Sequence, residues 1–268
     1  MRIGFIGGGN MAGALIGGLT GPTAPPVSVS VVEPLAAQRE ALAKRFGVTC
    51  HAAPDARALD VEVIVLAVKP QQMREAASAC APYAAGKLVI SVAAGIRLAD
   101  LQTWLGGHER IVRAMPNTPA LIGLGITGLC AASGSLASDR DAANRILRAV
   151  GETMWVDEEG LIDAVTAVSG SGPAYVFRFI EAIEQAAVSL GLPPADARRL
   201  TIATFVGASQ LAARSDEPPA VLRERVTSKG GTTAAALATM EAHHLGDTLA
   251  AAVHAACARS KELGQSPS

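Results

Sequence analysis

Hydrophobic residues in the first half of the chain alternate between strand-like and helix-like spacing. The run Val63–Val68 is apolar throughout, which is typical of a strand buried on both faces of a sheet. Strands that alternate with helical segments predict βαβ units and a parallel sheet. The expected strands are Arg2–Ile6, Val27–Val32, Val63–Val68, Leu88–Val92 and Arg110–Met115, with a last strand pair at Gly125–Cys130 and Thr153–Val156, and the expected helices are Asn10–Leu19 and Ala36–Phe46.

From about Leu161 onward the hydrophobic period is helical almost throughout. Gly191 with Pro193 and Pro194 marks the end of one helix and the start of the next. We place a boundary in the acidic turn at 157–160, so the pattern predicts an α/β domain over 1–158 and an all-α domain over 159–268. The expected helices of the second domain are Leu161–Val168, Ala174–Leu190, Pro194–Arg214, Ala220–Arg225, Thr232–His243 and Leu245–Lys261.

Composition narrows the class of protein further. Half of the residues are hydrophobic, only 3% are aromatic and 18% are charged, which favours a compact fold whose core is built from small aliphatic side chains. The net charge of −1 makes nucleic acid an unexpected partner. No run has the length of a membrane span and no targeting segment is evident, so we expect a cytoplasmic protein.

Cysteine and histidine usage points to no metal centre. The four cysteines are far apart and form no C-x-x-C pair, which favours free thiols in a reducing compartment. His254 and Cys257 are one helical turn apart, but two ligands are fewer than metal clusters usually show. We therefore predict no metal site.

The segment between the first strand and the first helix carries a candidate phosphate-binding loop. Residues 7–12 read GGGNMA and match G-x-G-x-x-A, a string that can also be an ordinary glycine turn. Gly7 permits the tight turn, Gly9 lets the backbone approach a pyrophosphate, and Ala12 allows close helix packing. The helix N-terminus offers N–H donors to phosphate oxygens. Because the string lies between a predicted strand and a predicted helix, we expect a dinucleotide site here.

Three further strand ends carry candidate cofactor contacts. Glu33 follows the second strand, where a carboxylate can accept hydrogen bonds from the ribose hydroxyls and repel a 2′-phosphate, so it slightly favours NADH over NADPH. Arg39 lies close in sequence and could hold a phosphate instead. Lys69 follows six apolar residues and is a candidate cofactor contact. The alternative interpretation is a lysine at the end of a strand that points to water. Val92–Gly95 ends a strand with small residues, which leaves room for a flat nicotinamide ring.

The helical half holds one candidate ligand loop. Residues 223–233 read RERVTSKGGTT, with two glycines that free the backbone and two threonines that open a helix, an arrangement that suits a carboxylate. A plain helix cap is the stronger reading from these residues alone. The strings MPNTP at 115–119 and SGSGP at 169–173 are expected to be loops. Ser171 lacks the preceding strand and the His and Asp partners of a nucleophile elbow.

Taken together in order, these strings resemble the pyrroline-5-carboxylate reductase family. The likeness covers nearly the whole chain: FIGGGNMAGALIGGL from Phe5, AVKPQ from Ala67, SVAAGI from Ser91, RAMPNTPALIGLGITGL from Arg113, SGSGPAYVF from Ser169 and VTSKGGTTAAAL from Val226. The resemblance implies a Rossmann-like N-terminal domain and an all-α C-terminal dimerisation domain. It also implies NAD(P)H-dependent reduction of 1-pyrroline-5-carboxylate to L-proline, the last step of proline biosynthesis, in homodimers that gather into larger rings such as decamers.

Carried over by position, the resemblance assigns the site residues. Thr233 is the implied catalytic residue, which hydrogen-bonds the ring nitrogen of the substrate. The substrate carboxylate is held by Ser228 and by backbone N–H groups around Gly231 and Thr232. The family usually has proline where this chain has Lys229, and often glycine where it has Ala236. The implied cofactor contacts, besides Glu33, are Ile6, Gly7, Gly8, Gly9, Asn10, Met11, Ala67, Val68, Lys69, Pro70, Val92, Ala93, Ala94, Gly95 and Asn117.

Two other functions compete with this interpretation. A β-hydroxyacid dehydrogenase shares the expected fold but relies on a lysine with an asparagine four residues later, and no K-x-x-x-N occurs in this chain. A non-catalytic nucleotide-binding protein of the same fold would have no need of Ser228, Gly231 and Thr233. The expected chemistry is hydride transfer to the carbon of a C=N bond, for which positioning matters more than a strong acid.

Overall fold

A computed structural model describes residues 1–22 and 24–265. The chain divides into two compact units, and each is described by itself below. The first unit comprises Met1–Ser171 together with the end of the chain from Ala255, and the second comprises Gly172–His254. The domain ranges 1–158 and 159–268 stay a prediction.

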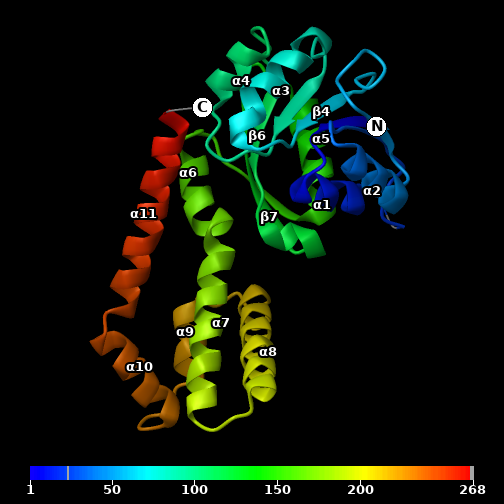
Figure 1. Ribbon diagram of the computed structural model, residues 1–268. Coiled ribbons are helices and arrows are strands. Elements are labelled where there is room, and N and C mark those ends of the chain that lie inside the picture. The colour runs from blue at the N-terminus through cyan, green and yellow to red at the C-terminus, as the bar shows by residue number, and fades with distance from the viewer. Residues whose placement is uncertain (23, 266–268) are drawn as a thin grey trace. The chain divides into compact units, whose positions relative to one another are not determined.

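The first unit is built on an eight-stranded sheet in the order β3-β2-β1-β4-β5-β6-β7-β8 (Figure 1). Neighbouring strands are parallel except β6 and β7, which are antiparallel. The strands are β1 Arg2–Ile6, β2 Ser28–Val32, β3 Thr49–His51, β4 Val63–Leu66, β5 Leu88–Ser91, β6 Ile111–Met115, β7 Gly125–Ala131 and β8 Gly151–Trp155. The expected strands are confirmed to within two residues at each end, and β3 is an additional one.

Apolar side chains of the central strands alternate between two hydrophobic clusters, one on each face of the sheet. Val63 and Val65 of β4 join one cluster, and Ile64 and Leu66 join the other. This arrangement explains why β4 is apolar at every position, since both of its faces are covered. The first cluster includes residues of α1 (Asn10–Leu19), α2 (Ala36–Phe46) and α5 (Ala137–Leu147), and the second includes residues of α3 (Met73–Cys80), α4 (Leu98–Trp104) and α6 (Leu161–Val165).

The parallel sheet predicted from the sequence is present, with one antiparallel pair between β6 and β7. Only residues 116–124 connect these strands, and they contain the short 3₁₀ helix η3 (Thr118–Ile122). Gly123 then turns the chain with a φ of +74°. A parallel connection needs a crossover of a dozen or more residues, so this segment is long enough only for an antiparallel return. The remaining 3₁₀ helices are η1 Pro70–Gln72, η2 Ala81–Tyr83 and η4 Arg148–Val150.

The expectation of a loop at 169–173 is wrong except at Ser171, because the rest of the SGSGP string is helical. Helix α6 passes into a π-helix, η5 (Thr166–Gly170), and α7 begins at Gly172. Gly170 lets the helix pack closely against Met115, since a Cβ atom at position 170 would lie 2.5 Å from Cε of Met115. Pro173 is the second residue of α7, where its missing N–H donor has no helical partner to lose.

The second unit consists of helices, as the period of its hydrophobic residues predicts. Its helices are α7 Gly172–Ser189, α8 Pro194–Ala213, α9 Pro219–Arg225, α10 Thr232–Ala242 and the first part of α11 Leu245–Gln265, which continues into the first unit. Helices α7, α9 and α10 contain no buried residue, and many of their large apolar side chains are exposed. No described helix is both long enough and apolar enough to cross a membrane.

Candidate functional site

The residues expected to contact a cofactor lie along one edge of the sheet of the first unit. Strands β1, β2, β4, β5 and β6 are mutually parallel, so their carboxyl ends meet at this edge. The strand order reverses its direction between β1 and β4, and ligands of open α/β sheets bind at such a switch point. The structure therefore brings together the sequence-predicted segments that follow these strands, namely 6–11, Glu33, 67–70, 92–95 and Asn117.

The glycine loop between β1 and α1 has the geometry that a phosphate-binding loop needs. Gly7 has a φ of +95°, and a Cβ atom there would lie 2.8 Å from the carbonyl oxygen of Ala67 and 2.9 Å from Cγ1 of Val68. The turn thus lies directly against the end of β4. A Cβ atom on Gly9 would meet no atom within 4 Å, which leaves open space beside the α1 N-terminus. Ala12 is fully buried, as expected for the position where the helix packs closely on the sheet.

Glu33 is turned toward the glycine loop and is only 8% exposed. Its Oε2 accepts a hydrogen bond from the N–H of Gly8 at 2.9 Å, and its Oε1 accepts one from the N–H of Leu35 at 2.9 Å. Nη1 of Arg39 donates to the carbonyl oxygens of Glu33, at 2.8 Å, and Pro34, at 2.7 Å. A carboxylate and a guanidinium therefore lie together where β2 ends.

The segments after β4, β5 and β6 contribute different features to the edge. Lys69 is exposed and lies directly before η1. Among the described residues, none pairs with its ammonium group. Gly95 has a φ of +74°, a conformation that favours glycine. The Asn117 side chain makes two hydrogen bonds within the first unit. Its Oδ1 accepts one from the N–H of Ile126 at 3.0 Å, and its Nδ2 donates one to Oγ of Ser169 at 3.1 Å.

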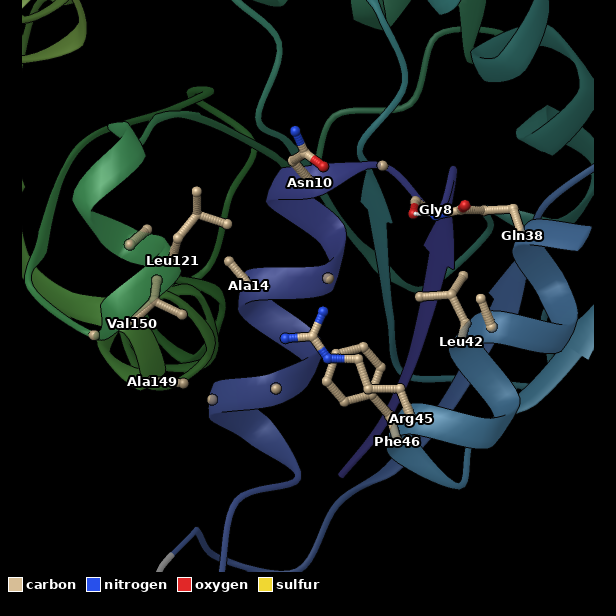
Figure 2. Close-up of a pocket in the computed structure, with 17 residues that line it drawn as sticks. Gly8, Asn10, Ala14, Gln38, Leu42, Arg45, Phe46, Leu121, Ala149 and Val150 are labelled. Atoms are coloured by element: carbon tan, nitrogen blue, oxygen red, sulfur yellow. Dashed lines mark hydrogen bonds between the residues drawn. The ribbon is translucent and has the colours of Figure 1, made fainter.

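A cavity of about 250 Å³ opens beside α1 and overlaps this edge at one end only (Figure 2). Figure 2 shows α1 between the segment that carries Leu121 and the helix α2 that carries Leu42 and Arg45. Of the sequence-predicted residues, Gly8, Gly9 and Asn10 line the cavity. The cavity does not include Glu33, 67–70 or 92–95, so it coincides with only part of the edge at which the sequence predicts the cofactor.

The substrate residues implied by the resemblance lie in the second unit, around the start of α10. Gly231 precedes α10, and its N–H donates to the carbonyl oxygen of Ser228 at 3.0 Å. A Cβ atom on Gly231 would clash with Oγ of Ser228 and lie 3.2 Å from its carbonyl oxygen, so a larger residue here would have to move the Ser228 side chain. Thr232 and Thr233 begin the helix, where N–H groups have no partner within the helix and can bind an anion.

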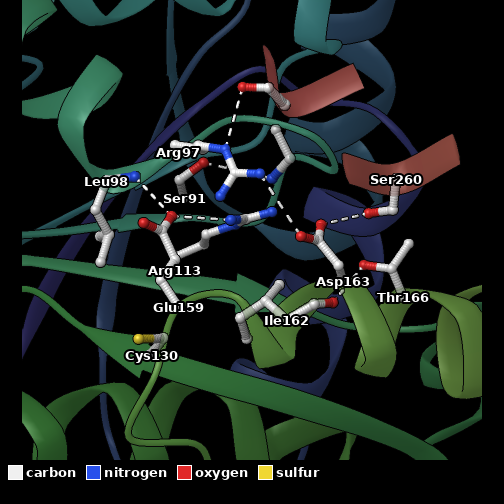
Figure 3. A network of polar contacts seen from close by, with 12 residues as sticks. Ser91, Arg97, Leu98, Arg113, Cys130, Glu159, Ile162, Asp163, Thr166 and Ser260 are labelled. Carbon is white, nitrogen blue, oxygen red and sulfur yellow. Dashed lines mark hydrogen bonds and ion pairs between the residues drawn. The ribbon is translucent and has the colours of Figure 1, made fainter. Parts of the chain in front are cut away.

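Sequence reasoning missed two polar features of the first unit. Nε2 of Gln38 donates to the carbonyl oxygen of Gly8 at 2.7 Å and so supports the glycine loop from α2. Arg113, only 1% exposed, pairs with Glu159 at 2.8 Å (Figure 3). Both contacts join residues far apart in sequence, so no local pattern announces them. Among the described residues, no group of three or more His, Cys, Asp or Glu side chains could hold a metal ion.

A doubly wound sheet with a glycine loop at its switch point, followed by a helical unit, defines a dinucleotide-binding oxidoreductase of two units. Residues 2–95 match the family model for NADP oxidoreductase, coenzyme F420-dependent, and residues 159–263 match the model for pyrroline-5-carboxylate reductase dimerisation. The pyrroline-5-carboxylate reductase of Pseudomonas aeruginosa is 44% identical over 98% of this chain and 97% of its own length. The chain belongs to the pyrroline-5-carboxylate reductase family.

Solved structures agree with this assignment. The pyrroline-5-carboxylate reductase of Coxiella burnetii superposes with a TM-score of 0.93 at 38% identity, and the match covers 98% of both chains. The Plasmodium falciparum pyrroline carboxylate reductase with NADP bound superposes with a TM-score of 0.87 at 31% identity, again over 98% of both chains. The resemblance seen in the sequence is thereby confirmed at the level of the family and of the fold.

Proposed function

We propose that this protein reduces 1-pyrroline-5-carboxylate to L-proline with NADPH or NADH. The observation that carries the proposal is the meeting of a glycine loop, a strand-end carboxylate and two strand-end loops at one switch point, in a chain whose relatives bear the name of this reductase. The open space at Gly9 and the N-terminus of α1 suit a pyrophosphate. The bound nicotinamide cofactor supplies the hydride.

The residues of the chain have mainly positioning tasks in this reaction. The N–H groups at the start of α10 and the hydroxyl of Ser228 hold the substrate carboxylate, because a helix N-terminus favours an anion. The hydroxyl of Thr233 orients the ring nitrogen and can relay a proton to it from water, taking up one proton as it gives up another, as the C=N bond is reduced. A protonated imine is already a good electrophile, so orientation supplies most of the catalysis and no strong acid is required.

The choice between the two nicotinamide cofactors depends on the pair at the end of β2. Glu33 provides a carboxylate at the end of β2, where we expect the adenosine ribose and where it would repel a 2′-phosphate, and Arg39 provides a guanidinium beside it that would suit a 2′-phosphate. Both carboxylate oxygens of Glu33 already accept backbone hydrogen bonds, which fixes the charge in place. We propose a slight preference for NADH. The NADP-bound Plasmodium falciparum relative supports use of the phosphorylated cofactor as well.

We also propose that the protein works as a homodimer, assembled into a larger ring such as a decamer, in the cytoplasm. The dimerisation model covers 159–263, and the second unit exposes apolar side chains that a second copy would bury. All four cysteines are free thiols, which suits a reducing compartment. Burial raises the pKa of the Cys80 thiol to about 12, so this thiol is unreactive in the folded protein.

The test is to mix purified protein with 1-pyrroline-5-carboxylate and follow oxidation of NADH and, separately, of NADPH. We expect rapid oxidation that depends on the imine, with a higher kcat/KM for NADH than for NADPH. A reaction without the imine gives the background rate. Folded protein that binds nucleotide but oxidises neither cofactor would refute the proposed reaction.

A further inference from the structure

The end of α11 packs against the loop that follows β5, and both belong to the first unit. Gly95, within the expected cofactor loop 92–95, lies so close to α11 that a Cβ atom there would be 3.3 Å from Cβ of Leu263. A segment from the very end of the chain thus contacts a loop that lies more than 160 residues earlier, as the Arg97–Gly264 pair also shows. This long-range contact calls for a reason beyond local helix stability.

Arg97 connects the loop to α11. Its Nε donates to the carbonyl oxygen of Gly264 at 3.2 Å, and its Nη2 lies 3.7 Å from Oδ2 of Asp163. Oγ of Ser260 donates to the other oxygen of the same carboxylate at 2.7 Å. Figure 3 shows the Arg97 guanidinium between α11 and Asp163, with Ser260 reaching the carboxylate from the helix. Asp163 and Ser260 are 2% and 4% exposed, so these contacts are shielded from water.

The helix is shaped for this contact at Gly264. A Cβ atom there would lie 2.9 Å from Nε and 3.2 Å from Nη2 of Arg97, so any larger residue would push the guanidinium away. Gly264 and Ser260 are four residues apart and therefore share one face of the helix. They are the buried residues of α11, whereas Leu263 beside them is 48% exposed.

The opposite flank of the loop is fixed as well. Oε1 of Glu159 accepts a hydrogen bond from the N–H of Leu98 at 2.8 Å and another from Nη1 of Arg113 at 2.8 Å (Figure 3). The start of α4 is therefore tied to a buried arginine on β6. The segment 95–98 is held on one side by β6 and on the other by the end of α11.

We propose that Ser260 and Gly264 of α11 position the loop 92–95 against which the nicotinamide cofactor binds, and that they do so through Arg97 and Asp163. This inference rests on the proposed function, since it uses the same loop as a cofactor contact. Ser260, Gly264 and Arg97 are positioning residues that contact neither the cofactor nor the substrate. Gly95 adopts its left-handed conformation with Leu263 packed beside it.

The test compares Gly264→Ala with Gly246→Ala, a matched change in the same helix. A Cβ atom on Gly246 meets nothing within 4 Å and Gly246 lies outside the first unit, so this control should leave the NADH Kd close to the wild-type value. For Gly264→Ala we expect a weaker NADH Kd in a fluorescence titration and a fall in kcat/KM for NADH of up to about 100-fold, because a misplacement of about 1 Å can cost that much. The KM for the imine should stay unchanged.

A second variant, Ser260→Ala, removes the hydrogen bond to Asp163 without adding volume. It should also weaken the NADH Kd and lower kcat/KM for NADH, but by smaller factors than Gly264→Ala. Lys261→Ala, an exposed change one residue away, serves as its control. Unchanged NADH Kd in both Gly264→Ala and Ser260→Ala would overturn the inference, and so would losses of activity that merely follow a fall in Tm. The NADH Kd is measured without turnover, so it tests this inference even if the proposed reaction is wrong. Wild-type protein that binds NADH but does not reduce the imine would refute only the proposed reaction.

Discussion

The two compact units bury their apolar side chains by different means. In the first unit, two clusters on the two faces of the sheet enclose residues such as Phe5 and Ile64 completely. In the second unit, α7 has no buried residue, and Phe177 on it is 64% exposed. The first unit completes its core within one chain, whereas the second exposes apolar surface of the kind that an obligate interface covers. Nucleotide binding and imine reduction should therefore be separable.

The most severe test of this comparison is Phe177→Asp. A carboxylate buried without a partner at an interface costs several kcal/mol, and each 1.4 kcal/mol is tenfold, so we expect the dimer to dissociate and kcat/KM for the imine to fall by at least about 100-fold. NADH binding to the first unit should survive. Light scattering after size-exclusion chromatography and an NADH titration measure the two outcomes.

The matched control for that change is Leu136→Asp, which alters an exposed leucine of the first unit. Leu136 precedes α5, where aspartate is a favourable N-cap residue, so neither assembly nor activity should change. A Phe177→Asp protein that stays dimeric and active would contradict the view that the second unit depends on a partner chain.

Thr233→Ala tests whether imine reduction can be lowered by a change in the second unit alone, with NADH binding left intact. Loss of the hydroxyl that orients the imine nitrogen should lower kcat by about 100-fold, because a misplacement of about 1 Å can cost that much. The NADH Kd should not change. Steady-state kinetics with varied imine measure the effect, and Thr232→Ala is the control, because Thr232 is expected to act through its backbone. Equal kinetics in Thr233→Ala and the wild type would remove Thr233 from the mechanism.

A paired change at the end of β2 tests the first unit alone. Glu33→Gln removes the charge facing the ribose, so the ratio of kcat/KM for NADH to that for NADPH should fall by about tenfold, within the 1–4 kcal/mol expected for charges about 4 Å apart near a protein surface. Any disturbance of the glycine loop affects both cofactors, and the ratio cancels it. Arg39→Ala should raise the same ratio. A ratio that is equal in all three proteins would show that neither charge selects the cofactor.

Asp139→Asn is expected to change stability with little effect on activity. Burial disfavours the charged form of Asp139, but hydrogen bonds from Arg110 and from the N–H of Leu136 outweigh it and lower the pKa of the carboxyl. The pair is bidentate, with contacts of 3.0 and 2.6 Å, and the Arg110 side chain is 30% exposed. We expect a loss of about 2 kcal/mol in the free energy of unfolding at pH 7, below the range for fully buried pairs.

The sign of the pH dependence follows from the lowered pKa of Asp139. The stabilisation is fully present above the unfolded carboxyl pKa of about 3.9 and is lost as the pH falls through the lower native value. Urea unfolding at several pH values should show the difference between wild type and Asp139→Asn shrinking only in strong acid. Asp141→Asn, an exposed change in the same helix, should show no such difference.

Sequence patterns predicted what depends on neighbours along the chain. The period of hydrophobic residues located most strands and the helices of the second unit, and the GGGNMA string located the glycine loop, because a turn at Gly7 and an opening at Gly9 are local requirements. The antiparallel return from β6 to β7 was missed, although the short segment before Gly123 could have signalled it.

Contacts between distant segments could not be predicted in this way. The bond from Arg97 to Gly264 and the pairing of Arg113 with Glu159 depend on how strands and helices pack, and neither residue type nor spacing indicates them. The π-helix at Thr166–Gly170 was missed as well, and it ends where Gly170 packs against Met115, a residue of a distant segment.

The buried Cys80 thiol on α3 can report how fast the folded protein unfolds. With a pKa of about 12, Cys80 is a thiolate in only about one molecule in 10⁵ at pH 7, and no surface of it is exposed to a reagent. Cys50 and Cys257 are partly exposed and should be modified first. Cys130 on β7 is buried as well, so the later labelling of Cys80 and Cys130 follows the rate at which the first unit unfolds, and a simple thiol-reactive dye reports the kinetic stability of that unit.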